Sequence, residues 1–155
     1  RLCICDFISG WIMRNLRSTR LASRDVMQPG LHMNAPAPEK VFSDFLDAFE
    51  ARDFDLLRSY LSDTQFSYQS PVSSYTSADT FVANIARVGP ILERIERRKI
   101  FVDGRMVCGI LNLKTTMEEL RLVPLVQLAT VVDGKITVLE AFFDATAYNR
   151  MFEPD

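Results

Sequence analysis

The sequence predicts an α+β domain in which three helices pack on the concave face of a curved antiparallel sheet, open like half of a barrel. From about residue 38 to residue 88, apolar side chains mostly recur every three or four positions, as on amphipathic helices. From about residue 93 to residue 144 the period changes to two, and turn sequences divide the segment into four runs. Helices followed by a run of strands are typical of α+β proteins. Such a half-barrel leaves a cavity between sheet and helix, a common place for a small ligand.

Three helices are expected before the sheet. The first follows Pro36 and Pro38, and Arg52-Asp53 interrupts its pattern. Asp53 is a suitable N-cap for a second, shorter helix, and Ser77 is one for a third, which Gly89-Pro90 ends. The apolar face of the first helix consists of Val41, Phe42, Phe45, Leu46 and Phe49.

The strands are expected in two groups. A half-buried strand at 64–70 lies between the second and third helices, and residues 73–75 form a loop after it. Asp103-Gly104 and Asp133-Gly134 predict tight hairpin turns, and Pro124 predicts a bulge or an edge position. The meander consists of strands near 93–102, 105–115, 120–132 and 135–144, and a short helix at 146–152 follows.

The composition narrows the class of protein. The chain has 155 residues, of which 48% are hydrophobic and 25% charged, close to the average for globular proteins. Its formal net charge of −2 argues against a nucleic-acid partner. No apolar run of about 18 residues is present, so no membrane partner and a cytoplasmic location are expected.

Charge divides the chain into two parts. Residues 1–33 contain five Arg and two Asp, a net charge of +3, and the only Trp and His of the chain. The remainder has a net charge of −5. We interpret residues 1–33 as a basic N-terminal extension that is non-native or disordered, with Met33 as the natural start, and residues 34–155 as the domain.

The domain offers little conventional catalytic chemistry. It contains no His, so His-based triads are excluded, and Cys108 has no His to activate it. It has no P-loop, no G-x-G-x-x-G and no zinc-ligand spacing. No cofactor and no metal are therefore expected, and any acid–base step depends on Asp, Glu, Tyr or Lys.

Asp144 is the best single candidate for such a step, and two roles are open to it. It follows a strongly apolar strand, where an apolar pocket would raise the pKa of its carboxyl into a useful range. It also stands immediately before the terminal helix, where a carboxylate is a natural N-cap.

The element order and three motifs resemble the nuclear-transport-factor-2-like superfamily, and within it the SnoaL-like group that includes ketosteroid isomerases and limonene-epoxide hydrolases. The motifs are the first helix with Arg52-Asp53-Phe54-Asp55, then Phe66-x-Tyr68-x-Ser70-Pro71, and finally Asp133-Gly134-Lys135-Ile136 leading to Phe142-Phe143-Asp144. The resemblance covers about residues 38–152. It implies a cone of curved sheet around a deep pocket, commonly assembled as a homodimer.

The resemblance also limits the reaction. The epoxide-hydrolase branch needs an Arg-x-Asp on a middle strand, and the matching strand here offers only Asn112 and Lys114. The isomerase branch needs a general-base carboxylate and a Tyr with an acidic partner. Tyr68 can supply the hydroxyl, but strand 64–70 has no carboxylate.

The sequence therefore predicts a domain that binds a small apolar molecule. A cofactor-free isomerase, cyclase or hydrolase remains open, and the alternative is a non-catalytic ligand-binding or dimerisation domain. Asp144 and Tyr68 are the candidate catalytic residues. Glu140 pairs with Asp144 if both share a strand face, or else faces solvent or a second subunit. The candidate ligand-binding residues are Tyr75, Ser70, Asn112, Gln127, Glu140 and Phe142.

Overall fold

The computed structural model describes residues 35–150, which form the predicted α+β arrangement. The basic extension expected at residues 1–33 lies outside the described residues, so the division of the chain stays a prediction. The same is true of the last residues of the expected terminal helix.

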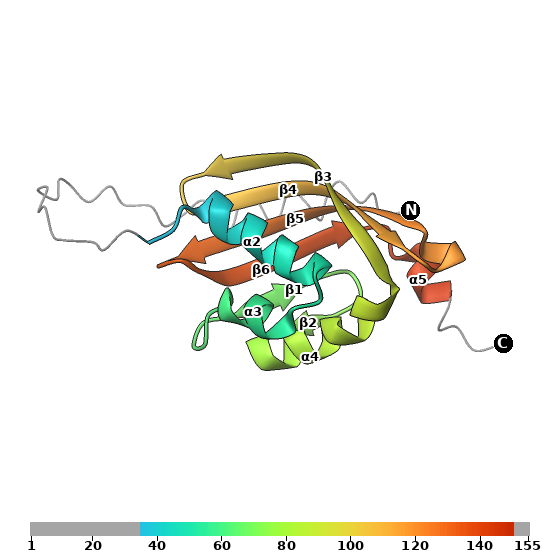
Figure 1. Ribbon diagram of the computed structural model, residues 1–155, viewed down its shortest axis with the longest axis horizontal. Coiled ribbons are helices and arrows are strands. Elements are labelled where there is room, and N and C mark those ends of the chain that lie inside the picture. Colours follow the sequence, from blue (N-terminus) through green and yellow to red (C-terminus); the bar gives the residue numbers. More distant parts are fainter. Residues whose placement is uncertain (1–34, 151–155) are drawn as a thin grey trace, which may run out of the picture. The chain divides into compact units, whose positions relative to one another are not determined.

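The described elements follow the predicted order (Figure 1). The helices are α2 (Pro38–Glu50), α3 (Phe54–Ser59), α4 (Ala78–Val88) and α5 (Thr146–Arg150), with 3-10 turns η1 (Gly89–Ile91) and η2 (Glu118–Leu120). The strands are β1 (Ser67–Gln69), β2 (Ser74–Tyr75), β3 (Leu92–Asp103), β4 (Met106–Thr115), β5 (Leu122–Val132) and β6 (Lys135–Phe143).

The sheet is mixed rather than wholly antiparallel. Its strand order is β2-β1-β6-β5-β4-β3, and β3 to β6 form the predicted antiparallel meander. Strand β1 pairs with β6 in parallel, whereas the sequence predicted an antiparallel sheet. Residues 74 and 75, expected in a loop, form the short strand β2 antiparallel to β1. Strands far apart in the sequence thus lie side by side at this end of the sheet.

The helix starts and most turns agree with the sequence. The Asp53 carboxylate accepts a hydrogen bond from the backbone N–H of Leu56 at 2.9 Å, and the Ser77 hydroxyl accepts one from Thr80 at 3.4 Å. Asp133 and Gly134 form a two-residue turn with φ of 51° and 75°, the left-handed conformation that such hairpins require.

Two local details differ from the expected turn and strand positions. The first hairpin turn lies one residue further on, at 104–105, because Asp103 still pairs with Met106. Pairing between β5 and β6 begins only at Leu125, so Pro124 has a neighbouring strand on one side alone, the predicted edge position.

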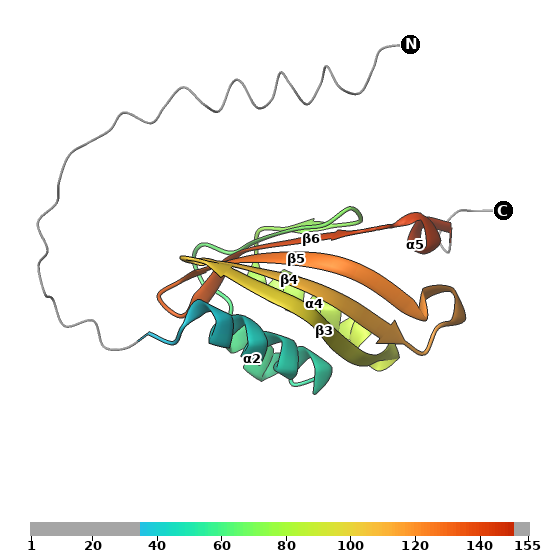
Figure 2. The same ribbon diagram turned by 90° about the horizontal axis from the view of Figure 1, so that it is seen from above.

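Cross-strand partners define the two faces of the sheet, because residues directly opposite each other point the same way. Gly109, Gln127 and Ala141 form one row on the inner face, the face that α2 covers. Figure 2 shows α2 running along one side of the curved layer of strands. The opposite face carries rows that include Phe101, Cys108 and Leu128, and Ile110, Val126 and Phe142.

Helix α2 comes close to the sheet at Gly109. The Phe42 ring is completely buried, and a Cβ atom built at Gly109 would lie 2.8 Å from it. The missing side chain therefore lets the ring lie directly on β4. Buried Val41, Phe45 and Leu46 join the same core.

The end of α2 is tied to β3 by polar contacts. The Glu50 carboxylate accepts a hydrogen bond from the backbone N–H of Ile95 at 2.7 Å, and Arg97 pairs with Asp47. Arg52 then donates to the carbonyl oxygens of Gly89 and Leu92, each at 2.8 Å. These bonds hold the strand edge against the helix.

We predict that Gly109→Ala lowers the free energy of unfolding by about 1–3 kcal/mol, because a methyl group there overlaps a fully buried ring. Phe42→Leu alone also destabilises, by about 1–3 kcal/mol, because it leaves a cavity over Gly109. The double variant should lose about 0.5–1 kcal/mol less than the summed single losses, measured by urea unfolding. Strictly additive losses would contradict the close contact.

Candidate functional site

A cavity of about 300 Å³ lies between the inner face of the sheet and the helices, within the range of small-molecule sites. Its lining is mainly apolar and comes from every layer of the domain. The helices contribute Phe45, Leu46, Phe49, Phe81, Asn84, Ile85, Val88 and Tyr148. The sheet and its loops contribute Tyr68, Val72, Ser73, Tyr75, Ile91, Ile95, Leu111, Leu113, Thr115, Leu120, Val123, Leu125, Gln127, Ala141, Phe143 and Asp144.

An aromatic cluster forms the end of the cavity beside β1 and β2. The rings of Tyr68 and Tyr75 are stacked with centroids 5.9 Å apart, and Phe81 from α4 lies 4.7 Å from the ring of Tyr68. Such contacts add to the stability that burial of the rings provides. Both predicted tyrosines thus line the cavity from the short β1–β2 hairpin.

Tyr68 is a neutral phenol in this setting. Burial raises the pKa of Tyr68 above its ordinary value of 10.0, a side-chain hydrogen bond with Ser70 opposes the shift, and neighbouring Tyr75 adds to it. Tyr68 can therefore orient a ligand through a hydrogen bond at neutral pH, but not as a phenolate.

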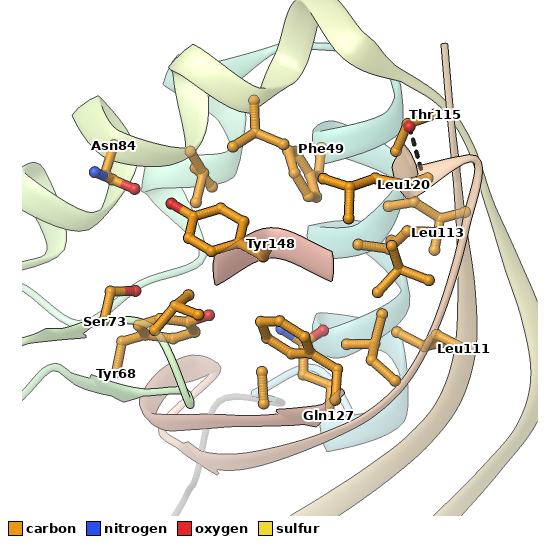
Figure 3. Close-up of a pocket in the computed structure, with 18 of the residues that line it drawn as sticks. Phe49, Tyr68, Ser73, Asn84, Leu111, Leu113, Thr115, Leu120, Gln127 and Tyr148 are labelled. Carbon is orange, nitrogen blue, oxygen red and sulfur yellow. Dashed lines mark hydrogen bonds between the residues drawn. The ribbon is translucent and has the colours of Figure 1, made fainter. Parts of the chain in front are cut away.

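Gln127 lies in the floor of the cavity, on β5, and is only 9% exposed. Its side chain has no hydrogen-bond partner within residues 35–150. Every fully enclosed polar side-chain atom of this part of the chain has a partner, so the Gln127 amide reaches the open space of the cavity. Figure 3 shows Tyr68 and Gln127 on one side of that space and Phe49 and Asn84 on the other.

Asp144 lies at the rim of the cavity and is exposed. Its carboxylate accepts a hydrogen bond from the backbone N–H of Thr146 at 2.9 Å. Bonds from the Thr146 side chain and backbone, with a smaller contribution from Arg150, hold the pKa of Asp144 below its ordinary value of 3.8. Asp144 thus makes the expected contact with the start of the terminal helix, and its pKa lies on the opposite side from the expected rise because Thr146 hydrogen-bonds an exposed carboxylate.

Three expected ligand contacts lie on the other side of the sheet. Asn112 pairs with Pro124, Glu140 with Leu128 and Phe142 with Val126, all on the outer face. The expectation that these side chains reach the cavity is wrong. Asp144 lies beyond the end of β6, so strand alternation does not place Glu140 beside it. Glu140 instead lies on the outer face, in agreement with the alternative that it faces solvent or a second subunit.

Ser70 is buried beside the cavity rather than in its lining. Its hydroxyl lies 3.2 Å from that of Ser73 and also accepts a hydrogen bond from the Ser73 backbone N–H. Ser73 lines the cavity in its place. Gln127, another expected ligand contact, does face the cavity.

Sequence reasoning missed several lining residues. Asn84 follows Phe81 by three positions on α4, so helical spacing already places it on the cavity side. Tyr148, on the short helix α5, gave no such signal. In Figure 3 its ring crosses the cavity between the two walls.

The described residues offer no obvious site for a metal ion, since no cluster of three His, Cys, Asp or Glu side chains occurs within 35–150. No helix in this range is long and apolar enough to cross a membrane.

Comparison with known proteins identifies the fold. No protein-family model and no curated protein sequence matches this chain. Solved structures do match. An NTF2-like protein from Cytophaga hutchinsonii superposes with a TM-score of 0.64 at 17% identity, covering 79% of this chain and 100% of its own.

Two further structures are similar. An LEH-like epoxide hydrolase from M. tuberculosis has a TM-score of 0.62 at 21% identity, covering 73% of this chain and 86% of its own. A Catenulispora acidiphila protein with a ketosteroid isomerase-like fold was solved in complex with trimethylamine. It has a TM-score of 0.61 at 13% identity, covering 70% of this chain and 88% of its own. The chain therefore has the nuclear-transport-factor-2-like fold that the resemblance predicted.

We predict that the Asp144 carboxyl titrates below 3.8, measured by NMR on the folded protein. Because its pKa is lowered on folding, the carboxylate stabilises the protein above the unfolded pKa. This stabilisation disappears as the pH falls through the folded value. Asp144→Ala should therefore lower the free energy of unfolding at pH 7. The difference in this free energy between variant and parent should vanish in strong acid. A midpoint above 3.8 would instead favour an acid–base carboxyl in apolar surroundings.

Proposed function

We propose that this domain binds a small apolar molecule in the cavity between sheet and helices. The observation that carries the proposal is the cavity itself, about 300 Å³ with a mainly apolar and aromatic lining. Filling such a space removes apolar surface of both ligand and protein from water, which stabilises the complex.

Two structural neighbours are compatible with this proposal. The M. tuberculosis neighbour is an epoxide hydrolase, and the Catenulispora protein was crystallised with trimethylamine. Proteins of this fold thus include one that acts on small organic molecules and one in complex with such a molecule. The fold alone does not transfer either property, because one fold hosts many functions.

Binding without carboxylate catalysis agrees best with the site. A general base is most effective with a pKa near the working pH, and the pKa of Asp144 is lowered. Catalysis by Asp144 with Tyr68, as an isomerase, cyclase or hydrolase, stays a prediction.

A second candidate function, self-association, is favoured by the outer face of the sheet. Phe101 is 52% exposed, Phe142 55% and Val126 36%, and these residues lie in adjacent rows of that face. The same rows also contain Lys99 and Glu140, and exposed apolar side chains among a few charges on one sheet face are typical of an interface. A second copy of this chain, related by a two-fold axis, would cover the same patch on both subunits.

We predict that the neutral fluorophore N-phenyl-1-naphthylamine binds the protein, with increased emission. Ile85→Trp, on the cavity side of α4, should weaken this binding at least about tenfold, because the larger ring fills the cavity. Ala83→Trp is the matched control, since Ala83 is exposed on the same helix. Circular dichroism establishes that both variants fold. Equal binding by the parent and Ile85→Trp would contradict the proposed site.

We also predict that the protein sediments as a dimer and that Phe142→Lys converts it to a monomer, measured by analytical ultracentrifugation. A charge placed among exposed apolar side chains that pack against a second copy loses its hydration. Leu56→Lys, on α3 and 44% exposed, is the control that should leave the dimer intact. A monomeric parent protein would exclude this assembly.

A further inference from the structure

Gln127 is placed in the floor of the cavity among residues that offer its amide nothing to bond. Its cross-strand neighbours on the inner face are Gly109 and Ala141, and its neighbours along β5 on that face are Leu125 and Ala129. Two of these side chains are small and one is absent, so space remains around the amide. The glutamine is nine-tenths buried, and its amide opens onto the cavity, where a ligand can reach it.

Thr115 and Gln127 are the two buried polar residues among the described lining residues, and Thr115 already has a partner. The Thr115 hydroxyl donates to the carbonyl of Leu120 at 2.9 Å, the dashed bond in Figure 3. Ser73, which is half-buried, contacts the Ser70 hydroxyl. Gln127 is thus the buried polar group of the described lining that is available to a ligand, whereas Tyr68, Tyr75 and Asn84 are half-buried.

The cavity lining almost entirely lacks the charged side chains that an ionic ligand would need. No Lys, Arg, His or Glu is among the described lining residues. The one ionisable carboxylate, Asp144, lies at the rim, where it repels an entering anion and is too solvated to neutralise a cation at the floor. Burying a ligand charge there without a partner would be costly.

We infer that the Gln127 amide recognises a neutral carbonyl or hydroxyl oxygen on an otherwise apolar, ring-sized ligand. The amide N–H₂ donates to either oxygen, and the amide carbonyl accepts from a hydroxyl. The surrounding aromatic and aliphatic side chains hold the apolar body. This inference rests on the proposed binding function and adds to it the class of ligand.

The test compares four probes that share one ring system. They are 2-acetylnaphthalene, its near-isosteric hydrocarbon 2-isopropylnaphthalene, 2-naphthoate and (2-naphthyl)methylammonium, each titrated as a competitor of N-phenyl-1-naphthylamine. On the parent protein we expect both charged probes to bind at least about tenfold more weakly than the ketone.

Gln127→Met is the decisive variant, because it keeps the length of the side chain and removes the amide. The ratio of ketone affinity to hydrocarbon affinity should fall about tenfold, the effect of one buried hydrogen bond. Gln127→Leu is a second variant for the case that Met packs poorly. Asn112→Leu, on the outer face, is the control that should leave the ratio unchanged.

A second measurement needs no ligand. Removal of an amide that bonds to no other part of the described protein should leave the urea midpoint of the empty protein unchanged or raise it, whereas removal of a structural glutamine would lower it. An unchanged ketone-to-hydrocarbon ratio, or tighter binding of either charged probe, overturns the inference while the cavity remains a binding site. Failure of the fluorophore and all four probes to bind overturns the proposed function together with the inference.

Discussion

The position of α2 depends on the contact between the Phe42 ring and the bare backbone of Gly109. Because no side chain separates them, the helix approaches β4 closely there, and its next turns bring Phe45, Leu46 and Phe49 over the sheet as one wall of the cavity. Glu50, bonded to the backbone of Ile95, holds the other end of the helix against β3. The cavity is therefore the space that remains when a helix is fixed at both ends across a curved sheet.

Local patterns in the sequence predicted most of this fold. Helical spacing from Val41 to Phe49, the caps Asp53 and Ser77, and the Asp133-Gly134 turn are all determined by neighbouring residues. The parallel pairing of β1 with β6 depends on residues about 70 positions apart, and β2 is too short to show a period. Neither leaves a local signal.

The site was harder to predict, because both faces of the central strands are apolar. Ile110, Val126 and Leu128 on the outer face are as hydrophobic as Leu111 and Leu125 on the inner face. Alternation separates the two sets without saying which one faces the helices. Gln127 was assigned to the cavity, whereas Glu140 and Phe142 were wrongly assigned to it for this reason. Asp144 was ambiguous for another reason, since a residue between strand and helix suits both a cap and a cavity rim.

This alternation also makes the two proposed functions separable. Val126 and Leu128 point to the outer face, and Gln127 between them points into the cavity, so one strand serves both surfaces through adjacent residues. A substitution on one face leaves the side chains of the other face in place. Any energetic coupling between ligand binding and self-association would therefore involve the backbone of β4, β5 and β6. The row that lies beneath α2 on these strands consists of Gly109, Gln127 and Ala141.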